Sequence, residues 1–555
     1  MSTSGVALLS VYDKTGIESF AEGLVSLGWK IYASGGTMQA IQAAGISVQD
    51  VAELVGGKAI LGHRVVTLSR EISAGLLADK NSEQDLSELA ALNLPVIDLV
   101  CVDMYPLEST ISKDGSTKEE VIAQTDIGGP TMLRSAAKGQ RIVVSRADQR
   151  EAVLAWLKDG KPNEAEFIEQ LAARGEYEAA RYILASARYR NGTQVSGFLA
   201  YQSAPTKYGE NPQQAEAALY ADNRLDLDPL AVDKFEHIKG MERSFINLTD
   251  LDRLLQTVTH IAAGFEQNFK KVPSIAVGVK HGNACGAGVA DSMAEAVKKM
   301  LEGDTRAIFG GMVMMNGPID ETVATILMHH AMEGDTSRLL DGVVGSSVSD
   351  EALQILSRNK LRVIINPALE NLSLNSIDTN RRLRPVRGGV LEQPNYNFIL
   401  DLSADYITHS QEASEAQKED MVLGWAIGCT SNSNTIAITK DSKLIGNGVG
   451  QQDRVGAGQL ALTRTTTALP DLRTEDDAIV LTIKLDKEKL SGATAYSDSF
   501  FPFPDGPGLL ADAGIRTILT SSGSVADQTV TESLVAKEVT VYMLPDKVGR
   551  GFYLH

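Results

Sequence analysis

Residues 6–37 read VALLSVYDKTGIESFAEGLVSLGWKIYASGGT, two short apolar runs separated by an amphipathic stretch. The runs at 6–12 and 29–34 have the length and composition of buried strands, and the stretch between them carries apolar residues at helical spacing. A strand, a helix and a second strand in this order form a right-handed parallel unit. The segment therefore predicts an α/β fold with a mostly parallel sheet.

The same alternation continues through about the first quarter of the chain, with a helix expected at 38–45 and strands at 96–105 and 141–146. Residues 147–192 are helical in pattern and rich in charge, which favours a bridging segment. A second and larger unit follows, with no sequence repeat and a weak compositional dip near 374–395. We therefore predict an N-terminal domain, a helical bridging segment and two further domains, at 1–146, 147–199, 200–374 and 375–555.

The composition is that of a globular protein with no affinity for polyanions. The chain has 555 residues, of which 43% are hydrophobic and 22% charged, and its formal net charge is −19. A strongly acidic chain repels nucleic acid and anionic membranes, and no apolar stretch reaches the roughly 18 residues that a membrane span requires. We expect neither nucleic acid nor a membrane as a partner.

Cysteine usage and the N-terminus favour the cytoplasm. Cys101, Cys285 and Cys429 are the only cysteines, and no two of them are spaced as a CxxC pair. The N-terminus, MSTSGVALLSVYDKTG, lacks the basic start and the long apolar run of a signal peptide. We therefore expect a cytoplasmic protein without a disulfide framework and without a metal site.

Two glycine-bearing turns follow the first two predicted strands, DKTG at 13–16 and SGGT at 34–37. Each opens a helix, so backbone N–H groups and the helix dipole favour an anion there. An ordinary strand-to-helix connection with a helix cap explains either turn equally well, and it is the better explanation for one turn alone. Two such turns on adjacent strands make a phosphate cradle an equally good hypothesis.

Three further segments carry groups suited to chemistry. In DIGGPTMLRSAAKG, Asp126 and Lys138 lie at the two ends of one predicted helix, and spacing alone favours a capped surface helix. In VKHGNACG, Lys280 and His281 end a strand, a good position for a general base, although a lone histidine is more often a satisfied polar residue. FFPFPDG, at 500–506, suits a flat polar heterocycle or a simple core. The residues alone predict an α/β enzyme for phosphorylated small molecules.

Taken in chain order, these segments resemble the bifunctional purine enzymes that join 5-aminoimidazole-4-carboxamide ribonucleotide (AICAR) formyltransferase to inosine monophosphate (IMP) cyclohydrolase. The motifs that carry the resemblance are SVYDKTG, ASGGT, MYP, DIGG with AAK, KYGENP, VKH with CG, FGG, SNSNTI, GVGQQDRV, SDSFFPF and GRGF. The resemblance implies an N-terminal methylglyoxal-synthase-like parallel-sheet domain and a C-terminal transformylase of two cytidine-deaminase-like α/β subdomains. It also implies a homodimer with a shared transformylase site.

The resemblance assigns roles to individual residues. His281 is the implied base of formyl transfer from 10-formyltetrahydrofolate, beside Lys280, and no metal is expected in the chemistry. Lys138 is the implied proton-transfer residue of the cyclohydrolase, with Asp126 and Tyr105. The resemblance implies AICAR contacts at Lys207, Tyr208, Gly310, Asp341, Asn434, Arg454 and Arg550. It implies folate contacts at Val455, Phe500, Asp505, Ser524 and Val525. The implied nucleotide contacts of the cyclohydrolase are Tyr12, Asp13, Lys14, Ser34, Gly35, Gly36, Thr37, Arg64, Thr67, Val102, Asp103 and Ile127.

Several positions depart from the family pattern. Val66 stands where a lysine is usual, and Asp103 where an asparagine is usual; both changes weaken an anion site. Losing one hydrogen bond to a charged group costs about 1.5–3 kcal/mol, or on the order of ten- to 150-fold in binding or rate. Lys207 replaces an arginine, so it keeps the charge but cannot donate the paired hydrogen bonds of a guanidinium. Gln213 replaces a common histidine, and Ala284 replaces a common proline.

Three alternative hypotheses stay open. The N-terminal domain could be a nucleotide-binding or structural module beside an active transformylase, as Val66 and Asp103 suggest, unless Arg64 or Arg70 compensates. A non-catalytic nucleotide sensor is the second alternative, and the lysine–histidine pair of VKH speaks against it. A zinc deaminase of related fold is the third, and the absence of paired cysteines speaks against it.

Overall fold

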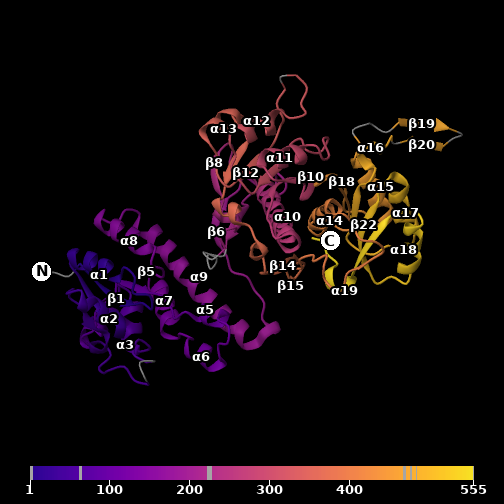
Figure 1. Cartoon of the computed structure of the whole chain (residues 1–555). Coiled ribbons are helices and arrows are strands. Elements are labelled where there is room, and N and C mark those ends of the chain that lie inside the picture. Colours follow the sequence, from indigo (N-terminus) through magenta and orange to yellow (C-terminus); the bar gives the residue numbers. More distant parts are fainter. Residues whose placement is uncertain are drawn as a thin grey trace. The chain divides into compact units, whose positions relative to one another are not determined.

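The computed structural model divides the chain into two compact units, Met1–Leu199 and Ala200–His555, which are described separately (Figure 1). It describes residues 4–61, 65–221, 228–334, 336–466, 471–475, 478–482 and 484–553. Within these ranges, no helix is both long enough and apolar enough to cross a membrane.

Unit 1 is built on a five-stranded parallel sheet. The strand order is β3-β2-β1-β4-β5, and every neighbouring pair is parallel. Leu8, Val100 and Val143, from three neighbouring strands, are fully buried in its core. This sheet confirms the predicted α/β class and brings the carboxyl ends of all strands to one edge. The strands are β1 (Gly5–Ser10), β2 (Trp29–Ala33), β3 (Gln49–Asp50), β4 (Leu99–Val102) and β5 (Ile142–Val144).

The predicted bridging segment, 147–199, packs within unit 1. Its long helix lies against α7 and β5, with Leu171 and Tyr182 buried. Gly175 permits this approach, because a Cβ atom there would lie 2.5 Å from Val143 Cγ1. The helices of unit 1 are α1 (Ile17–Ser26), α2 (Gly35–Ala43), α3 (Arg70–Leu77), α4 (Glu83–Ala91), α5 (Leu107–Ser112), α6 (Lys118–Ala123), α7 (Gly128–Lys138), α8 (Gln149–Lys158) and α9 (Glu164–Asn191).

Unit 2 is built on one twelve-stranded mixed sheet, so the two predicted C-terminal domains share a continuous sheet. The strand order is β16-β23-β22-β21-β17-β18-β10-β9-β11-β12-β13-β8. The strands are β8 (Glu236–Lys239), β9 (Ser274–Lys280), β10 (Asn283–Ala290), β11 (Met312–Met315), β12 (Gly342–Gly345), β13 (Arg362–Ile365), β16 (Thr408–His409), β17 (Ile436–Lys440), β18 (Lys443–Gly448), β21 (Thr494–Ser497), β22 (Thr517–Ser522) and β23 (Thr540–Pro545).

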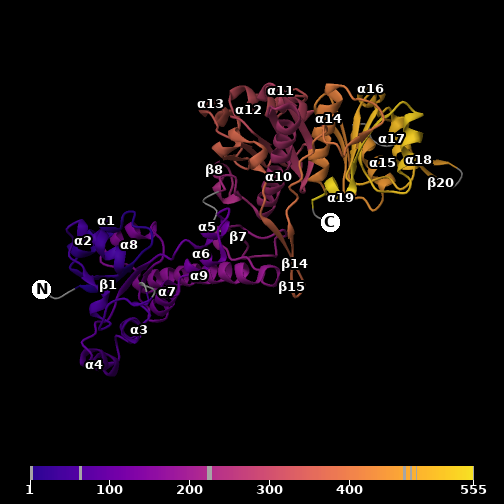
Figure 2. The same ribbon diagram turned by 60° about the horizontal axis from the view of Figure 1, so that its bottom comes forward.

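Helices cover both faces of this sheet. The helices α10 and α14 pack side by side on one face, around the fully buried Trp425 (Figure 2). Two separate core clusters on the other face lie under α11 to α13 and under α15, α17 and α18. The helices are α10 (Phe245–Phe269), α11 (Met293–Leu301), α12 (Glu321–His329), α13 (Asp350–Ile355), α14 (Glu415–Cys429), α15 (Arg454–Arg464), α16 (Lys487–Leu490), α17 (Asp505–Ala513), α18 (Asp527–Val535) and α19 (Asp546–Gly549).

Three two-stranded hairpins complete the described elements of unit 2. They pair β6 (Tyr201–Pro205) with β7 (Ala218–Ala221), β14 (Arg381–Val386) with β15 (Gly389–Pro394), and β19 (Asp471–Glu475) with β20 (Ala478–Thr482).

The large sheet is internally duplicated about its central antiparallel pair, β10 and β18. Moving outward from this pair, both halves show a hairpin, then parallel strands, then one antiparallel edge strand. Both hairpins are held in the same way: Asp250 of α10 accepts the Gly282 N–H at 2.8 Å, and Asp420 of α14 accepts the Ser442 N–H at 2.8 Å. The sequence shows no repeat, so the duplication is visible only in the fold.

Asp420 makes the stability of unit 2 depend on pH. Burial raises the pKa of this carboxyl to about 7 from its ordinary value of 3.8. The folded state therefore keeps a proton that the unfolded chain has released between about pH 4 and pH 7, and the free energy of unfolding falls as the pH rises through this window. The slope is at most about 1.4 kcal/mol per pH unit for one proton.

Asp420→Asn removes this dependence and keeps an acceptor for the Ser442 N–H. We expect the melting temperature of the variant, relative to wild type, to be higher at about pH 8 than at about pH 5. Thermal unfolding at both pH values measures the difference. A difference that is the same at both pH values would contradict a buried titrating carboxyl at this position.

Candidate active sites

The two glycine turns of unit 1 lie together at the carboxyl edge of its sheet. Thr37 Oγ1 accepts the Val11 N–H at 3.0 Å and donates to the Val11 carbonyl at 3.1 Å. The hydroxyls of Ser10 and Ser34 lie 2.7 Å apart. Lys14 Nζ donates to the carbonyls of Val11 and Tyr12, the second at 2.9 Å. The predicted residues at 12–14 and 34–37 therefore form one polar surface.

Asp103, the departure from the family pattern, binds the backbone of the first turn. Its carboxylate accepts the N–H groups of Tyr12 and Asp13, the latter at 3.3 Å. Arg150 Nη2 lies 3.8 Å from the same carboxylate, and Arg150 Nη1 donates to the Thr15 carbonyl at 2.6 Å. Burial raises the pKa of Asp103, and the Tyr12 N–H and Arg150 oppose that rise. The negative charge added by Asp103 thus has a buried cationic partner.

Arg150 was not predicted from the sequence, because it lies in the first turn of α8, far along the chain from the glycine turn. Of the two arginines considered as compensating groups, Arg64 falls outside the described residues. Arg70 is exposed and pairs with its neighbour Glu71 at 3.2 Å. Val66 packs against the hydrophobic core of unit 1 and supplies no charge. The positive charge that lies beside the Asp103 carboxylate is that of Arg150.

Asp126, Tyr105 and Thr67 gather beside these turns. Asp126 accepts the Gly129 N–H at 3.0 Å, and burial raises the pKa of its carboxyl. Burial and Asp126 together raise the pKa of Tyr105, whose ring meets the Tyr12 ring edge-on with centroids 5.9 Å apart. A Cβ atom at Gly128 would lie 2.7 Å from Thr67 Oγ1, which places this hydroxyl at the start of α7.

Lys138 does not join this group within one chain. It is the last residue of the eleven-residue helix α7, whereas Asp126 precedes the first residue. At about 1.5 Å per residue the two ends of α7 are about 15 Å apart. Of the remaining nucleotide positions, Val102 ends the buried strand β4, and Ile127 is exposed before α7.

The predicted base of unit 2 lies at the tip of the β9–β10 hairpin. Lys280 ends β9, Asn283 begins β10 and pairs with it, and His281 and Gly282 form the two-residue turn. Both turn residues are left-handed, with φ of 52° and 72°, as hairpin turns of this length require. The His281 side chain is exposed, and Lys280 Nζ donates to the Phe309 carbonyl at 2.8 Å.

Gly310 and Asp341 lie beside this turn. A Cβ atom at Gly311 would lie 2.5 Å from the Val279 carbonyl oxygen, and Asp341 donates its N–H to the Gly311 carbonyl at 2.9 Å. Arg362 Nη1 donates to the Asp341 carbonyl at 3.3 Å. The first half of unit 2 thus brings a histidine, a glycine turn and an aspartate into one neighbourhood.

Lys207 and Tyr208 join the same neighbourhood. Burial lowers the pKa of Arg362, and Asp341 and Tyr208 both oppose that shift, so Tyr208 lies close to Arg362. Lys207 is exposed, with Nζ 5.9 Å from the centroid of the Tyr208 ring. Arg362 itself was not predicted from the sequence.

The second half of unit 2 contributes the segment that follows α14. Asn432 donates its N–H to Asn283 Oδ1 at 3.1 Å, which joins this segment to the hairpin. Asn434 lies two residues on and donates its side-chain amide to the Gln451 carbonyl at 2.8 Å. Arg454 forms an ion pair with Asp498, whose side chain is fully buried. Asn434 and Arg454 therefore lie on the side of the hairpin that faces the second half.

The predicted folate positions surround the carboxyl ends of β21 and β22. A Cβ atom at Gly506 would lie 3.8 Å from Val455, and one at Gly523 would lie 4.0 Å from Phe500. Asp505 is exposed at the first residue of α17. The other two folate positions follow β22: Ser524, which accepts the Ala526 N–H at 3.1 Å, and Val525, which is fully exposed. Arg550, a predicted AICAR position, follows β23 and lies 3.6 Å from Asp546 Oδ2.

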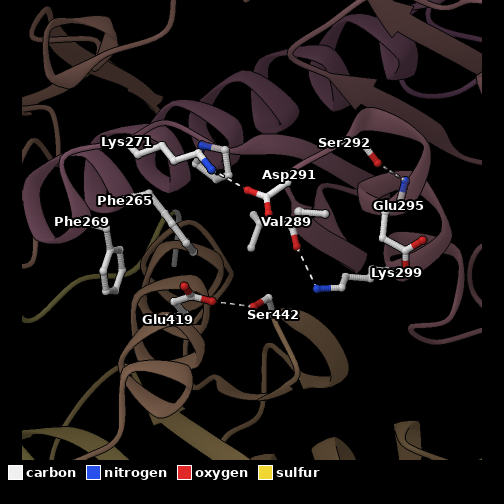
Figure 3. Close-up of a pocket in the computed structure, with 12 residues that line it drawn as sticks. Phe265, Phe269, Lys271, Val289, Asp291, Ser292, Glu295, Lys299, Glu419 and Ser442 are labelled. Atoms are coloured by element: carbon white, nitrogen blue, oxygen red, sulfur yellow. Dashed lines mark hydrogen bonds and ion pairs between the residues drawn. The ribbon is translucent and has the colours of Figure 1, made fainter.

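A cavity of about 460 Å³ lies elsewhere, at the ends of β9 and β10 opposite His281 (Figure 3). Lys271 and Asp291 pair at its rim, and Ser442 and Glu419 are joined by a hydrogen bond of 2.9 Å. None of the predicted site residues lines it.

The donor groups do not gather as a metal site. Within the ranges that the structure describes, no group of three or more His, Cys, Asp or Glu side chains is arranged to hold an ion. Burial raises the pKa of the Cys285 thiol to about 12, far from the thiolate that zinc binds.

Fold and site together define an α/β protein with a parallel-sheet unit, whose two glycine turns lie at one edge of the sheet, and a duplicated unit that carries an exposed histidine. The model of the AICARFT/IMPCHase bienzyme family matches residues 136–464, and that of the MGS-like domain matches residues 16–131. The chain belongs to the AICARFT/IMPCHase bienzyme family, and it is a bifunctional enzyme of purine biosynthesis.

Relatives named bifunctional purine biosynthesis protein PurH match almost the whole chain. The protein from Staphylococcus saprophyticus is 32% identical over 529 residues, and that from Listeria welshimeri is 34% identical over 537, each match covering 94% of this chain and 95% of the relative. The protein from Synechococcus elongatus is 33% identical over 531 residues, or 94% of each chain. The crystal structure of ForH is 33% identical over 35% of this chain and all of that chain, with a TM-score of 0.30.

Proposed function

We propose that unit 2 transfers the formyl group of 10-formyltetrahydrofolate to the 5-amino group of AICAR, with His281 as the base. The amine nitrogen attacks the formyl carbon and its proton passes to the imidazole. The bond from the formyl carbon to N10 then breaks, and N10 leaves with the electron pair and takes up a proton. The observation that carries this proposal is the exposed imidazole at the tip of a rigid hairpin.

The nucleotide and the folate would bind on two sides of that imidazole. AICAR would contact residues from both halves of the sheet, including Asp341 and Asn434, because both lie next to the hairpin. The folate would lie along Val455 and Phe500, at the ends of β21 and β22. Lys280 would stabilise the negative charge that develops on the formyl oxygen.

We further propose a cytoplasmic homodimer in which the second copy completes the transformylase site. Val525 is fully exposed and Phe503 is 67% exposed, both near the proposed folate position. Large exposed apolar side chains beside a site favour cover by a ligand or by another chain. Sedimentation of the purified protein at twice the monomer mass is the expected result, and a monomer would overturn the shared site.

For unit 1 we propose ring closure of formyl-AICAR to IMP. The carboxamide nitrogen attacks the formyl carbon, and that carbon loses its oxygen as water. Asp126 is the proposed partner in proton exchange, because it lies beside Tyr105 and burial raises the pKa of its carboxyl. The turns at 13–16 and 34–37 would hold the phosphate. Lys138 stays a prediction, and in this chain it lies at the other end of α7.

Arg150→Met tests the cyclohydrolase assignment. Without Arg150, the Asp103 carboxylate faces the anion site uncompensated, and losing one charge-assisted interaction costs about 1.5–3 kcal/mol. We expect ring closure to slow by about ten- to 150-fold with formyl transfer unchanged. The measurement supplies AICAR and 10-formyltetrahydrofolate and follows formyl-AICAR and IMP separately.

Arg70→Met is the control, because the Arg70 side chain is exposed and forms an ion pair with the neighbouring Glu71 at 3.2 Å. Equal rates of IMP formation in both variants would show that Arg150 plays no part. If the wild-type protein accumulates formyl-AICAR without IMP, unit 1 is a nucleotide-binding or structural module. The amides already occupied by Asp103 are the observation that favours this second candidate.

A further inference from the structure

The two hairpin turns of unit 2 are held by the same device, and only one of them carries a base. Asp250 and Asp420 are each 5% exposed, and each accepts one N–H from its turn at 2.8 Å. The turn held by Asp250 contains His281, and the turn held by Asp420 contains Asp441 at the corresponding left-handed position. A buried aspartate therefore holds both turns, whereas the proposed chemistry involves only the turn with His281.

The groups that face Asp250 come from four elements. The charged or titratable groups are Arg253 on the same helix, His281 on the hairpin and Asp341 before β12, and the neutral Cys285 thiol on β10 lies near them. Burial raises the pKa of Asp250, whereas the Gly282 N–H and then His281 lower it. Arg253 donates to the carbonyls of Thr430 and Tyr553 and stacks on the Tyr553 ring at 4.0 Å.

We infer that Asp250 is a positioning residue of the formyl-transfer site, which fixes the His281 turn and, as a carboxylate, stabilises the imidazolium that forms there. This inference rests on the proposed role of His281. The imidazole gains a positive charge when it takes the amine proton, and a nearby buried carboxylate favours that charged form. No hydrogen bond joins the two side chains among the described contacts, so Asp250 acts through the backbone of the turn and through its field.

The two functions of Asp250 are separated by two substitutions. Asp250→Asn keeps an oxygen acceptor for the Gly282 N–H and removes the charge. We expect kcat for formyl transfer to fall about tenfold, and the acid limb of the kcat/KM profile to move to lower pH by about 0.5–1 unit, because the imidazolium is less stable. Asp250→Ala also removes the acceptor, and we expect a further rise in KM for AICAR.

Asp420→Asn is the matched control within the same molecule. It makes the same chemical change at the same place in the repeated half, next to a turn without a base. We expect its pH profile and KM for AICAR to be those of wild type. Melting temperatures of all three variants confirm that each is folded before rates are compared.

The outcomes separate this inference from the proposed function. An unshifted acid limb in Asp250→Asn, with His281→Ala inactive, overturns the inference and leaves the proposed function in place. An equal shift in Asp420→Asn also overturns it, because the effect would then be one of folding. Undiminished turnover in His281→Ala overturns the proposed function itself.

Discussion

Replacing His281 by alanine lowers the rate of formyl transfer by about 10²–10⁴, the usual contribution of a general base. The amine of AICAR is a weak nucleophile because its lone pair is delocalised toward the carboxamide. Proton removal and orientation must then supply much of the acceleration. Formation of formyl-AICAR measures the loss. Conversion of added formyl-AICAR to IMP stays at the wild-type rate, because unit 1 folds around its own core.

His281→Asn is the matched control for the backbone of the turn. His281 has a φ of 52°, and asparagine tolerates this left-handed conformation better than alanine does. We expect both variants to be inactive and to bind AICAR nearly as well as wild type. Activity in the asparagine variant with inactivity in the alanine variant would mean that the turn, and not the imidazole, matters.

Replacing Arg454 by methionine destabilises unit 2 by about 3–5 kcal/mol, the usual cost of leaving one member of a buried ion pair alone. The Asp498 side chain is fully buried, and after the substitution it keeps the hydrogen bond from the Ser433 hydroxyl, at 2.7 Å, but no longer has its cationic partner. We also expect AICAR binding to weaken, because Arg454 is a proposed nucleotide contact. Thermal unfolding and nucleotide titration measure the two effects.

Two controls accompany this variant. Lys537→Met breaks the exposed Lys537–Asp512 pair and costs about 0.2–1 kcal/mol. The double variant Arg454→Met, Asp498→Asn removes both charges, so we expect much of the stability to return without AICAR binding. A single Arg454 variant as stable as the Lys537 variant would contradict the buried pair.

The fold of unit 1 could be predicted because its signals are local. The apolar runs at 6–12 and 29–34 became β1 and β2, and the run at 96–105 contains β4. The helical character of 147–192 was also predictable, but the packing of α9 within unit 1 was not, since its many charges hide a narrow buried stripe that includes Tyr182. Recognising that stripe requires knowing that α7 and β5 lie beneath it.

The site could be predicted only where its residues follow one another in sequence. Lys280 and His281 end a strand, which places them at the edge of a sheet from the pattern alone. Asp250 meets Gly282 across 32 residues, and Arg150 meets the Thr15 carbonyl across 135. No spacing rule gives such contacts, because they depend on how whole helices lie against the sheet.

The two halves of the large sheet meet at β10 and β18, which are antiparallel. The turn between β9 and β10, with His281, and the turn between β17 and β18, with Asp441, therefore lie at opposite edges, or rims, of the sheet. The rim that carries His281 holds the residues of the proposed formyl-transfer site. The rim that carries Asp441 holds none of them, and the cavity of Figure 3 lies there. The duplicated fold thus gives this protein a second hairpin turn, at Asp441, without a proposed catalytic residue, and we expect exposed positions around it to accept substitutions without loss of turnover.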